Sequence, residues 1–438
     1  MTAPARGVRV VLDARPLQEP DRAPLTAAYL DALLRAYDDA PLAGESFALL
    51  LRSDLDDPTA TLTNLDVVGR RLLPPTHLLR SAALTVDSLV LSGASVGAAW
   101  RAEAGGASGA VYHAAGGAVP LVTGLPLVVT LLDLAPWELP AAYQRSTAAR
   151  FGQRLRSRLL RDAAAVIVGS EAVATAARRL LHLRRDRIRV VPFAPRPAFR
   201  LATSAARPAV SEEASRQPPT PARRSDPRPD PRADARSERD RLGLPARYLV
   251  YAGRYDARQD LTTLLRALEL LGGVGRRADL PDDVPWPPRV LLVGASPDDR
   301  AAVARAAVRV DVGDVLSYAP RLDDDRVAAL VRGARAAILP ALSDAAALPA
   351  IEAISCGTPV VASAVGALPE AVGSAGILVQ PRDPERLASA LATIWADDAV
   401  HDGLADAAVA RATDETRSWA DVAAETRLVY LEAAARRP

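Results

Sequence analysis

A short tract in the second half of the chain has the features of a phosphate-binding turn. An aliphatic run at 337–339 is followed by a loop, and Pro349 and Gly357 then delimit a run of helix-forming residues. Proline is tolerated in the first helical turn, and glycine adopts the left-handed conformation that ends helices. The spacing therefore predicts a helix whose unpaired N–H groups and positive dipole end could bind phosphate. The residues at its start are Leu348, Pro349, Ala350 and Ile351.

Side chains near this turn could complete the site. Glu352 could accept hydrogen bonds from sugar hydroxyls, or it could merely complement the helix dipole. Arg254 follows the aliphatic run at 248–251, and its planar fork would match two oxygens of a diphosphate. The alternative for Arg254 is a solvated arginine at a strand end. Gly366 and Glu370 follow the strand expected at 359–362, so we expect their loop at the same edge.

Short aliphatic runs alternate with longer helical patterns along both halves of the chain. This rhythm predicts α/β domains with mostly parallel sheets. In such sheets ligands bind beyond the carboxyl ends of the strands, so a cleft between two facing domains is the expected active site. The expected strands are 8–12, 47–51, 110–112, 127–131 and 165–168 in the first half, and 248–251, 290–293, 336–339 and 359–362 in the second.

Residues 201–240 separate the two halves. The segment is rich in Pro and Arg and has few large apolar side chains, so it cannot bury enough apolar surface to offset the entropy of ordering. We expect a disordered insertion or linker at 199–243 between two complete domains.

Composition excludes several classes of protein. The 438 residues include 54 basic and 52 acidic side chains, a net charge of +2, so no basic surplus suggests a nucleic-acid partner. Every basic residue is Arg, which excludes Schiff-base chemistry and a Walker-type phosphate loop, because both need a lysine amine. One cysteine and scattered histidines predict no structural metal. We also expect no leader peptide and no membrane span, and hence a cytoplasmic protein.

In their order, these segments resemble the retaining, nucleotide-sugar-dependent glycosyltransferases of the GT-B fold, typified by glycogen and mannosyl transferases. The resemblance covers nearly the whole chain and is carried by 12–16, 128–133, 169–171, 251–254, the proline-helix tract, 366–370 and 419–430. It implies two Rossmann-like domains facing across a cleft. The acceptor-side domain would span 1–198 and the nucleotide-sugar-binding domain 244–415, and a helix within 416–438 would cross back to the first domain.

The resemblance also implies roles for individual residues. The donor would be a UDP-, GDP- or ADP-sugar, bound without a cofactor and without a metal. Arg254 resembles the diphosphate clamp, Glu352 the ribose-binding carboxylate, and 348–351 the helix start above the phosphates. Gly366 and Glu370 resemble the next donor loop. In the family the leaving diphosphate helps deprotonate the acceptor on the same sugar face, so the protein mainly positions substrates and stabilises charge.

Several positions depart from the family pattern in the donor half of the cleft. The phosphate-binding lysine of the family matches Gln259, although the adjacent Arg258 could substitute. The first carboxylate of the Glu-x7-Glu pattern matches Asp344, which is one methylene shorter. The Gly-Phe-Gly loop reads Ala-Ala-Ala at 345–347, which puts methyl groups where bare backbone normally approaches the donor.

Further departures lie in the first domain. The His-Asp pair of the family reads Leu132 and Asp133, so only the carboxylate remains to face the sugar. The glycine-rich turn near the start matches 24–27, which has no glycine. His113 matches a family position and could line the acceptor cleft, although a core histidine is the alternative.

The sequence leaves three functions open. The first is a glycosyltransferase in which Asp133, Asp344 and Glu352 are the catalytic carboxylates. The second is a catalytically silent relative that binds a nucleotide, a glycan or a partner transferase. The third is a serine hydrolase, because 93–97 matches the Gly-x-Ser-x-Gly nucleophile motif, with Ser95 as nucleophile and His401 as base.

A basic helix is expected at 145–161. It places Arg150, Arg154 and Arg158 at near-helical intervals beside an apolar stripe of Phe151, Leu155 and Leu159. Such a helix could lie on anionic lipid at the inner membrane face. The commoner arrangement is a surface helix with its apolar stripe packed inward. No pattern in the sequence indicates an oligomeric state.

Overall fold

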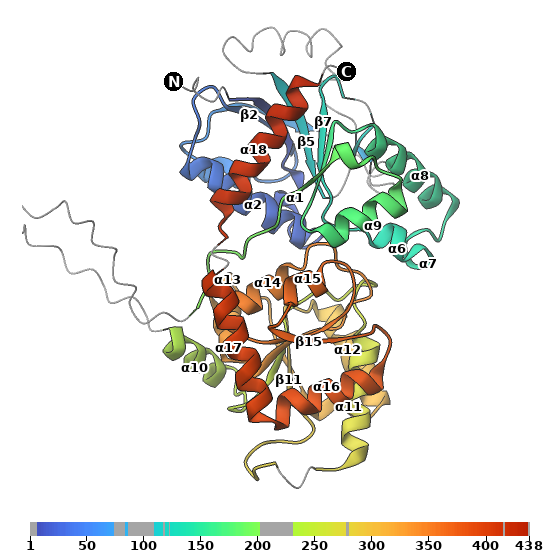
Figure 1. The fold of residues 1–438 in the computed structure, drawn as a ribbon, viewed down its shortest axis with the longest axis vertical. Coiled ribbons are helices and arrows are strands. Elements are labelled where there is room, and N and C mark those ends of the chain that lie inside the picture. The colour runs from blue at the N-terminus through green and yellow to red at the C-terminus, as the bar shows by residue number, and fades with distance from the viewer. Residues whose placement is uncertain are drawn as a thin grey trace, which may run out of the picture.

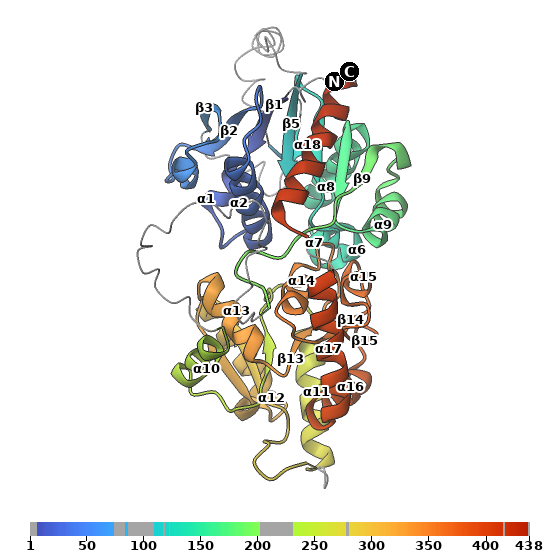
Figure 2. The same ribbon diagram turned by 60° about the vertical axis from the view of Figure 1, so that its left-hand side comes forward.

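The computed structural model describes residues 7–73, 84–85, 109–116, 119–121, 123–201, 231–276, 280–414 and 417–436. These residues form two α/β domains, one above the other in Figures 1 and 2. Within them, no helix combines the length and the apolar character that a bilayer crossing requires.

The first domain is built on a parallel sheet of strand order β3-β2-β1-β5-β7-β8-β9. The central strands are buried because alternate side chains face helix layers on both sides, as expected of parallel sheets, whereas Val68 of the edge strand β3 is exposed. A two-stranded parallel pair, β4 (Leu84–Thr85) and β6 (Val119–Pro120), lies apart from this sheet. The strands of the main sheet are β1 (Arg9–Asp13), β2 (Ser46–Arg52), β3 (Val67–Leu73), β5 (Ala110–Ala115), β7 (Leu127–Thr130), β8 (Ala165–Val168) and β9 (Ile188–Val190).

Helices connect these strands, and side chains cap the longer ones. Ser146 and Ser170 accept hydrogen bonds from the N–H groups of Ala149 and Val173, three residues on, which is the preferred way to satisfy a helix start. The helices are α1 (Arg15–Gln18), α2 (Pro24–Asp39), α6 (Ala135–Glu138), α7 (Pro140–Tyr143), α8 (Thr147–Asp162) and α9 (Glu171–Leu181).

The second domain repeats this architecture with the parallel strand order β12-β11-β10-β13-β14-β15. This is the order of dinucleotide-binding folds. Its strands are β10 (Leu249–Tyr251), β11 (Val290–Val293), β12 (Leu316–Ala319), β13 (Ala336–Leu339), β14 (Val360–Ser363) and β15 (Gly376–Val379). Its helices are α11 (Leu261–Val274), α12 (Pro297–Arg309), α13 (Asp324–Gly333), α14 (Leu348–Ser355), α15 (Leu368–Val372), α16 (Pro384–Ala396) and α17 (Asp398–Asp414).

Part of the segment expected to be a disordered linker is folded. Helix α10 (Pro231–Arg241) packs against α13 of the second domain. Glu238 on α10 is almost fully buried and receives hydrogen bonds from Arg326 of α13 at 3.0 and 2.6 Å. The expectation for 199–243 is therefore wrong over the helix, because an ion pair and helix packing compensate for its scarcity of apolar residues.

The last helix returns to the first domain. Figures 1 and 2 show α17 along the lower domain and α18 (Trp419–Ala435) along the upper one, where α18 contacts α2, β5 and β7. Arg427 of α18 pairs with the buried Glu45 at 2.7 Å, and its guanidinium stacks on Tyr37 at 4.7 Å. Removing one partner of such a buried pair leaves an uncompensated charge, so the pair fixes α18 in place.

His113 belongs to this internal packing and not to the cleft. Its side chain is 0% exposed. Its Nε2 lies 2.8 Å from Thr130 Oγ1, and its Nδ1 lies 2.8 Å from the Tyr430 hydroxyl of α18. The expectation that His113 lines an acceptor cleft is wrong. Burial lowers the pKa of His113 to about 3, so the ring is neutral in the folded protein.

This buried ring makes stability depend on pH. In the unfolded chain His113 binds a proton near pH 6.5, whereas the folded protein resists protonation down to about pH 3. We therefore expect the free energy of unfolding to fall by up to about 1.4 kcal/mol for each pH unit below 6.5 through this residue. His113→Gln should remove that slope in thermal melts between pH 7 and pH 4. Parallel slopes for both proteins would contradict the assignment.

Candidate functional site

A cavity of about 210 Å³ lies between the two domains. Its walls come from the loops that follow β7, β10 and β13 and from the start of α2. In both sheets the strand order reverses near these loops, beside β1 and β10, which is where ligands bind to doubly wound sheets. We call this space the cleft cavity. Of the predicted site residues, it is lined by Asp133, Arg254, Arg258, Gln259, Asp344, Leu348, Pro349 and Glu352.

Helix α14 starts at the cavity as expected, but it offers fewer free N–H groups. Pro349 lies in the first turn, and Gly357 has a φ of +75° just beyond the end. The N–H groups of Ala350 and Ile351 both bond to the carbonyl of Ala347 at 3.0 Å. Neither residue lines the cleft cavity. The expectation that Ala350 and Ile351 contact phosphate is therefore not supported by this arrangement, because both N–H groups are already bonded within the first turn of the helix.

Asp344 supports the backbone at the start of α14. Its Oδ1 accepts hydrogen bonds from the N–H groups of Ala346 at 3.1 Å and Ala347 at 2.7 Å. Burial raises the pKa of this carboxyl, and the two backbone donors oppose that rise. The Asp344 carbonyl also accepts from Ala367 N–H at 2.8 Å. Asp344 therefore faces the cavity with one carboxylate oxygen already committed to the loop.

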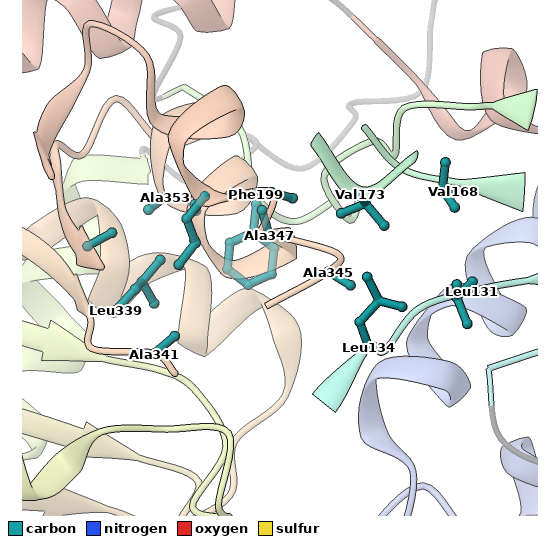
Figure 3. Packing of buried hydrophobic residues seen from close by; sticks show 14 of the residues in the cluster. Leu131, Leu134, Val168, Val173, Phe199, Leu339, Ala341, Ala345, Ala347 and Ala353 are labelled. Carbon is teal, nitrogen blue, oxygen red and sulfur yellow. The ribbon is translucent and has the colours of Figure 1, made fainter. Parts of the chain in front are cut away.

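The alanine side chains of the loop at 345–347 make apolar contacts, where glycines would leave the backbone exposed. Ala347 adopts the left-handed conformation with φ of +50°. Figure 3 shows Ala345 beside Leu134 of the first domain, and both belong to one buried cluster that spans the two domains. The methyl groups at this loop thus help to hold the domains together.

Two arginines of the second domain project into the cavity, and both have acidic partners. Arg258 donates to Asp133 of the first domain at 2.6 Å and also pairs with Asp256. Arg254 lies 3.6 Å from Asp256. Burial lowers the pKa of Arg254, and the neighbouring charge of Arg258 lowers it further. These two cations repel each other at the place where the sequence analysis expects a diphosphate.

Glu352 is held by a residue that the sequence analysis did not single out. Arg196 lies in the segment that leaves β9 and crosses to the second domain. It donates through Nε to Oε1 of Glu352 at 2.5 Å and through Nη2 to Oε2 at 3.0 Å. Burial raises the pKa of Glu352, and the Arg196 fork opposes that rise. The sequence gives one indication of this contact: Arg196 is a charged residue between Pro195 and Pro197, in the segment that joins the two domains.

Gly366 and Glu370 lie away from the cleft cavity. A Cβ on Gly366 would stand 1.8 Å from the Asp344 carbonyl oxygen, so glycine is required there for loop packing. The Glu370 carboxylate accepts from the N–H groups of Glu171 at 3.4 Å and Ala172 at 3.2 Å, at the start of α9 in the first domain. Their loop lies at the expected sheet edge, against Asp344, but neither residue lines the cavity, and Glu370 instead bridges the two domains.

Helix α8 carries arginines on two faces: most of them are exposed, and one is buried in the interior. Arg150, Arg154 and Arg158 are exposed, and Phe151 on the same face is 68% exposed. The expected inward stripe is therefore wrong at Phe151, whereas Leu155 and Leu159 are partly buried. Arg156 points the other way.

Arg156 is a buried cation with few interactions that would offset the cost of burying its charge. Its side chain is only 5% exposed and lies 4.9 Å above the Trp137 ring. Its Nε has no hydrogen-bond partner, and its guanidinium forms no ion pair with any described residue. Burial lowers its pKa to about 10, and the charge of Asp133 partly offsets this. At neutral pH Arg156 is thus still positive and close enough to Asp133 to feel its field.

Two remaining expectations concern other chemistries. The motif at 93–97, with Ser95, lies outside the described residues, and His401 lies on α17 beside Asp402 at 2.8 Å. Among the described residues, no three His, Cys, Asp or Glu side chains gather as metal ligands.

Comparisons with known proteins concern the fold and the second domain. Residues 246–397 match the family model described as glycosyl transferases group 1. A D-inositol 3-phosphate glycosyltransferase of Streptomyces griseus is 34% identical over 209 residues, covering 47% of this chain and 43% of that protein. An MMP alpha-(1->4)-mannosyltransferase of Mycolicibacterium hassiacum is 40% identical over 128 residues, covering 28% of this chain and 31% of that protein. The chain is thus matched over less than half the length of these curated relatives.

Solved structures resemble the whole chain at low sequence identity. Sucrose-phosphate synthase from Thermosynechococcus elongatus superposes with a TM-score of 0.68 at 21% identity, covering 97% of this chain and 98% of that one. Anabaena HepE in complex with UDP and glucose gives a TM-score of 0.62 at 17% identity, covering 96% and 98%. The chain therefore has the GT-B fold, and residues 246–397 match the model of the glycosyl transferases group 1 family.

Proposed function

We propose that this protein transfers a sugar from a nucleotide-diphosphate donor to an acceptor in the cleft cavity, with retention and without a metal. The observation that carries the proposal is the convergence of Arg254, Arg258 and the start of α14 on one cavity of a group 1 domain. HepE, a protein of the same fold, was solved with UDP. Two arginines suit a leaving diphosphate because they stabilise the charge that develops on it.

The carboxylates of the cavity favour a role in positioning over nucleophilic attack. Asp133 pairs with Arg258, Asp344 accepts from backbone N–H groups, and Glu352 pairs with Arg196. A nucleophile must present an unengaged oxygen to the reacting carbon. Asp133 and Glu352 are engaged in ion pairs, and the backbone holds one oxygen of Asp344. We therefore assign deprotonation of the acceptor hydroxyl to the leaving diphosphate, which places the acceptor on the face of the sugar that the diphosphate leaves.

Donor binding requires the cavity to enlarge. Pockets for ligands of this size occupy roughly 300–1,000 Å³, whereas the cleft cavity measures about 210 Å³. The Arg258–Asp133 pair and the hydrogen bond from Ser343 to Glu138 both join the two domains. Opening would release Arg258 from Asp133 so that it can contact phosphate. Subsequent closure around the donor would exclude water from the reacting sugar.

Arg254→Ala should weaken the binding of nucleoside diphosphates. Hydrogen bonds to charged groups contribute about 1.5–3 kcal/mol each, so the dissociation constant should rise roughly 10- to 100-fold. Calorimetric titration of UDP, GDP and ADP measures this change. The matched control is Arg266→Ala on α11, where the arginine pairs with Glu269 on the surface. Equal affinities for the Arg254 variant and the intact protein would remove the basis of the proposal.

The intact protein and the Arg254 variant also distinguish a transferase from a protein that binds the nucleotide without catalysis. A transferase should release nucleoside diphosphate from the donor, to water or to an acceptor, in the presence of EDTA. The released sugar should keep the anomeric configuration of the donor, which NMR detects. Tight nucleotide binding without release would instead support the catalytically silent alternative.

The acceptor is proposed to carry an anionic group such as a phosphate ester. Arg156 is a buried cation that lacks an anionic partner among the described residues and feels the charge of Asp133 at the cleft. Burying a charge without compensation is costly. Arg156 does not line the cleft cavity, so an acceptor phosphate beside Asp133 would offset that cost through its electric field. The names of relatives such as D-inositol 3-phosphate glycosyltransferase and sucrose-phosphate synthase support this class of substrate.

Arg156→Met should stabilise the free protein and abolish its response to sugar phosphates. Replacing an uncompensated buried charge by an apolar side chain of similar length should add about 1–4 kcal/mol of stability. Thermal shift assays with glucose 6-phosphate and with glucose measure the response. Arg158→Met, on the exposed face of α8, serves as the control. A lower melting temperature for Arg156→Met, together with an unchanged response to glucose 6-phosphate, would show that Arg156 has a purely structural role.

We further propose that the exposed face of α8 contacts anionic lipid. Arg150, Arg154 and Arg158 provide the charge, and the exposed Phe151 provides an apolar side chain that can enter the interface. Each arginine near an anionic surface contributes about 1 kcal/mol, and an exposed aromatic side chain adds apolar contact.

Sedimentation with lipid vesicles tests this contact. We expect binding to phosphatidylserine-containing vesicles at low salt and loss of binding at high salt, because surface charges are screened. Arg154→Gln should reduce the partition coefficient about fivefold, whereas Arg266→Gln on the second domain should not change it. Equal sedimentation with neutral and anionic vesicles would overturn the proposal.

A further inference from the structure

Arg196 stands between two spaces on opposite sides of the domain crossing. On one side it lines the cleft cavity together with Glu352. On the other side it lines a larger groove of about 780 Å³, the outer groove, which is formed by α2, residues 195–199, Arg321 and Asp324. Asp324 does not line the cleft cavity, and Glu352 does not line the outer groove. The guanidinium therefore has one carboxylate partner in each space.

The contacts to the two partners are unequal. Arg196 gives Glu352 two parallel hydrogen bonds, through Nε and Nη2. Its Nη1 donates to Asp324, whose side chain is half exposed at the start of α13. Glu352 is only 4% exposed, so its open side faces the cavity that Arg196 also lines. A diol that binds Glu352 through two O–H donors needs the same paired oxygens as the guanidinium fork.

The groups around Arg196 allow it to leave Glu352 without becoming an unpaired charge. Asp324 already accepts from it, and its guanidinium lies 4.7 Å from the Phe199 ring. The backbone on both sides is fixed, because Trp419 donates to the Pro195 carbonyl at 3.0 Å and Arg332 donates to the Ala198 carbonyl at 3.1 Å. Rotation of the side chain is then sufficient to exchange partners, and no movement of the crossing segment is needed.

We propose that Arg196 competes with the ribose of the nucleotide for Glu352 and thereby determines how strongly this chain recognises ribose. In the free protein Arg196 occupies both oxygens of Glu352. When a nucleotide binds, its ribose hydroxyls replace the fork, and Arg196 remains paired with Asp324 in the outer groove. This inference rests on the proposed function, because it requires a nucleotide in the cleft cavity.

The test combines protein variants with nucleotides that lack the competing hydroxyls. The probes are UDP, GDP and ADP and their 2′,3′-dideoxy counterparts, with dissociation constants measured by calorimetry. Arg196→Met removes the competitor and should tighten binding of the ribose nucleotide about tenfold, with no gain for the dideoxy nucleotide. Asp324→Asn removes the alternative partner and should weaken binding of the ribose nucleotide a few-fold, again without effect on the dideoxy nucleotide.

The controls separate this inference from the proposed function. Arg266→Met removes an exposed arginine of α11 that pairs with Glu269 on the same helix, and it should leave all affinities unchanged. Weaker binding of the ribose nucleotide by Arg196→Met would show that Arg196 positions Glu352 for ribose, which overturns the competition while the nucleotide site stands. Absence of binding of every nucleotide to the intact protein would overturn both proposals. If Arg196→Met does not fold, the opposite sign expected for Asp324→Asn still decides.

Discussion

Ion pairs within the chain neutralise the positive charge of the cleft. Arg258 is paired with Asp133 and Asp256, and Arg196 with Glu352 and Asp324. In a partly buried site such pairs are needed, because an unpaired cation there would carry a large desolvation cost. The consequence is that an anionic ligand must displace carboxylates of the protein before it gains the attraction of these arginines. The affinity of the site thus depends on the difference in free energy between the arginine–carboxylate pairs of the protein and the arginine–ligand pairs that replace them.

Backbone hydrogen bonds and apolar packing shape the loop that replaces the Gly-Phe-Gly pattern. With alanines at 345–347, backbone N–H groups of the loop bond to the Asp344 carboxylate, and the methyl group of Ala345 packs toward Leu134. Gly366 then has to approach the Asp344 carbonyl without a side chain. One substitution in this loop would therefore disturb the α14 start, the domain contact and the second loop together. This linkage explains how a pattern that departs from the family at several positions can still form a coherent cavity wall.

Much of the architecture was predictable from periodicity, and the side-chain partners were not. Buried aliphatic runs such as 127–131 and 290–293 predicted strands at the right places, and the order of motifs predicted the GT-B fold. Strands β3, β9, β12 and β15 of the two main sheets were missed, because Arg, Ser or Gly interrupts their short aliphatic runs. Arg254, Arg258 and the start of α14 were expected at one cavity, and all line it. Arg196 and Arg156 were overlooked because their importance depends on burial and pairing, which no local pattern in the sequence reveals.

The crossing segment couples these local pairs to the relation between the domains. Arg417 and Trp419, at the start of α18, donate to the carbonyls of Pro192 and Pro195, so the returning helix holds the backbone that carries Arg196. A side chain anchored in this way can exchange partners faster than the domains can separate. Opening of the cleft and release of Glu352 are then distinct steps with different determinants: the first breaks the Arg258–Asp133 pair, and the second breaks the Arg196–Glu352 pair. Because both pairs line the same cavity, their contributions to donor binding should be coupled, and a double-mutant cycle measures that coupling.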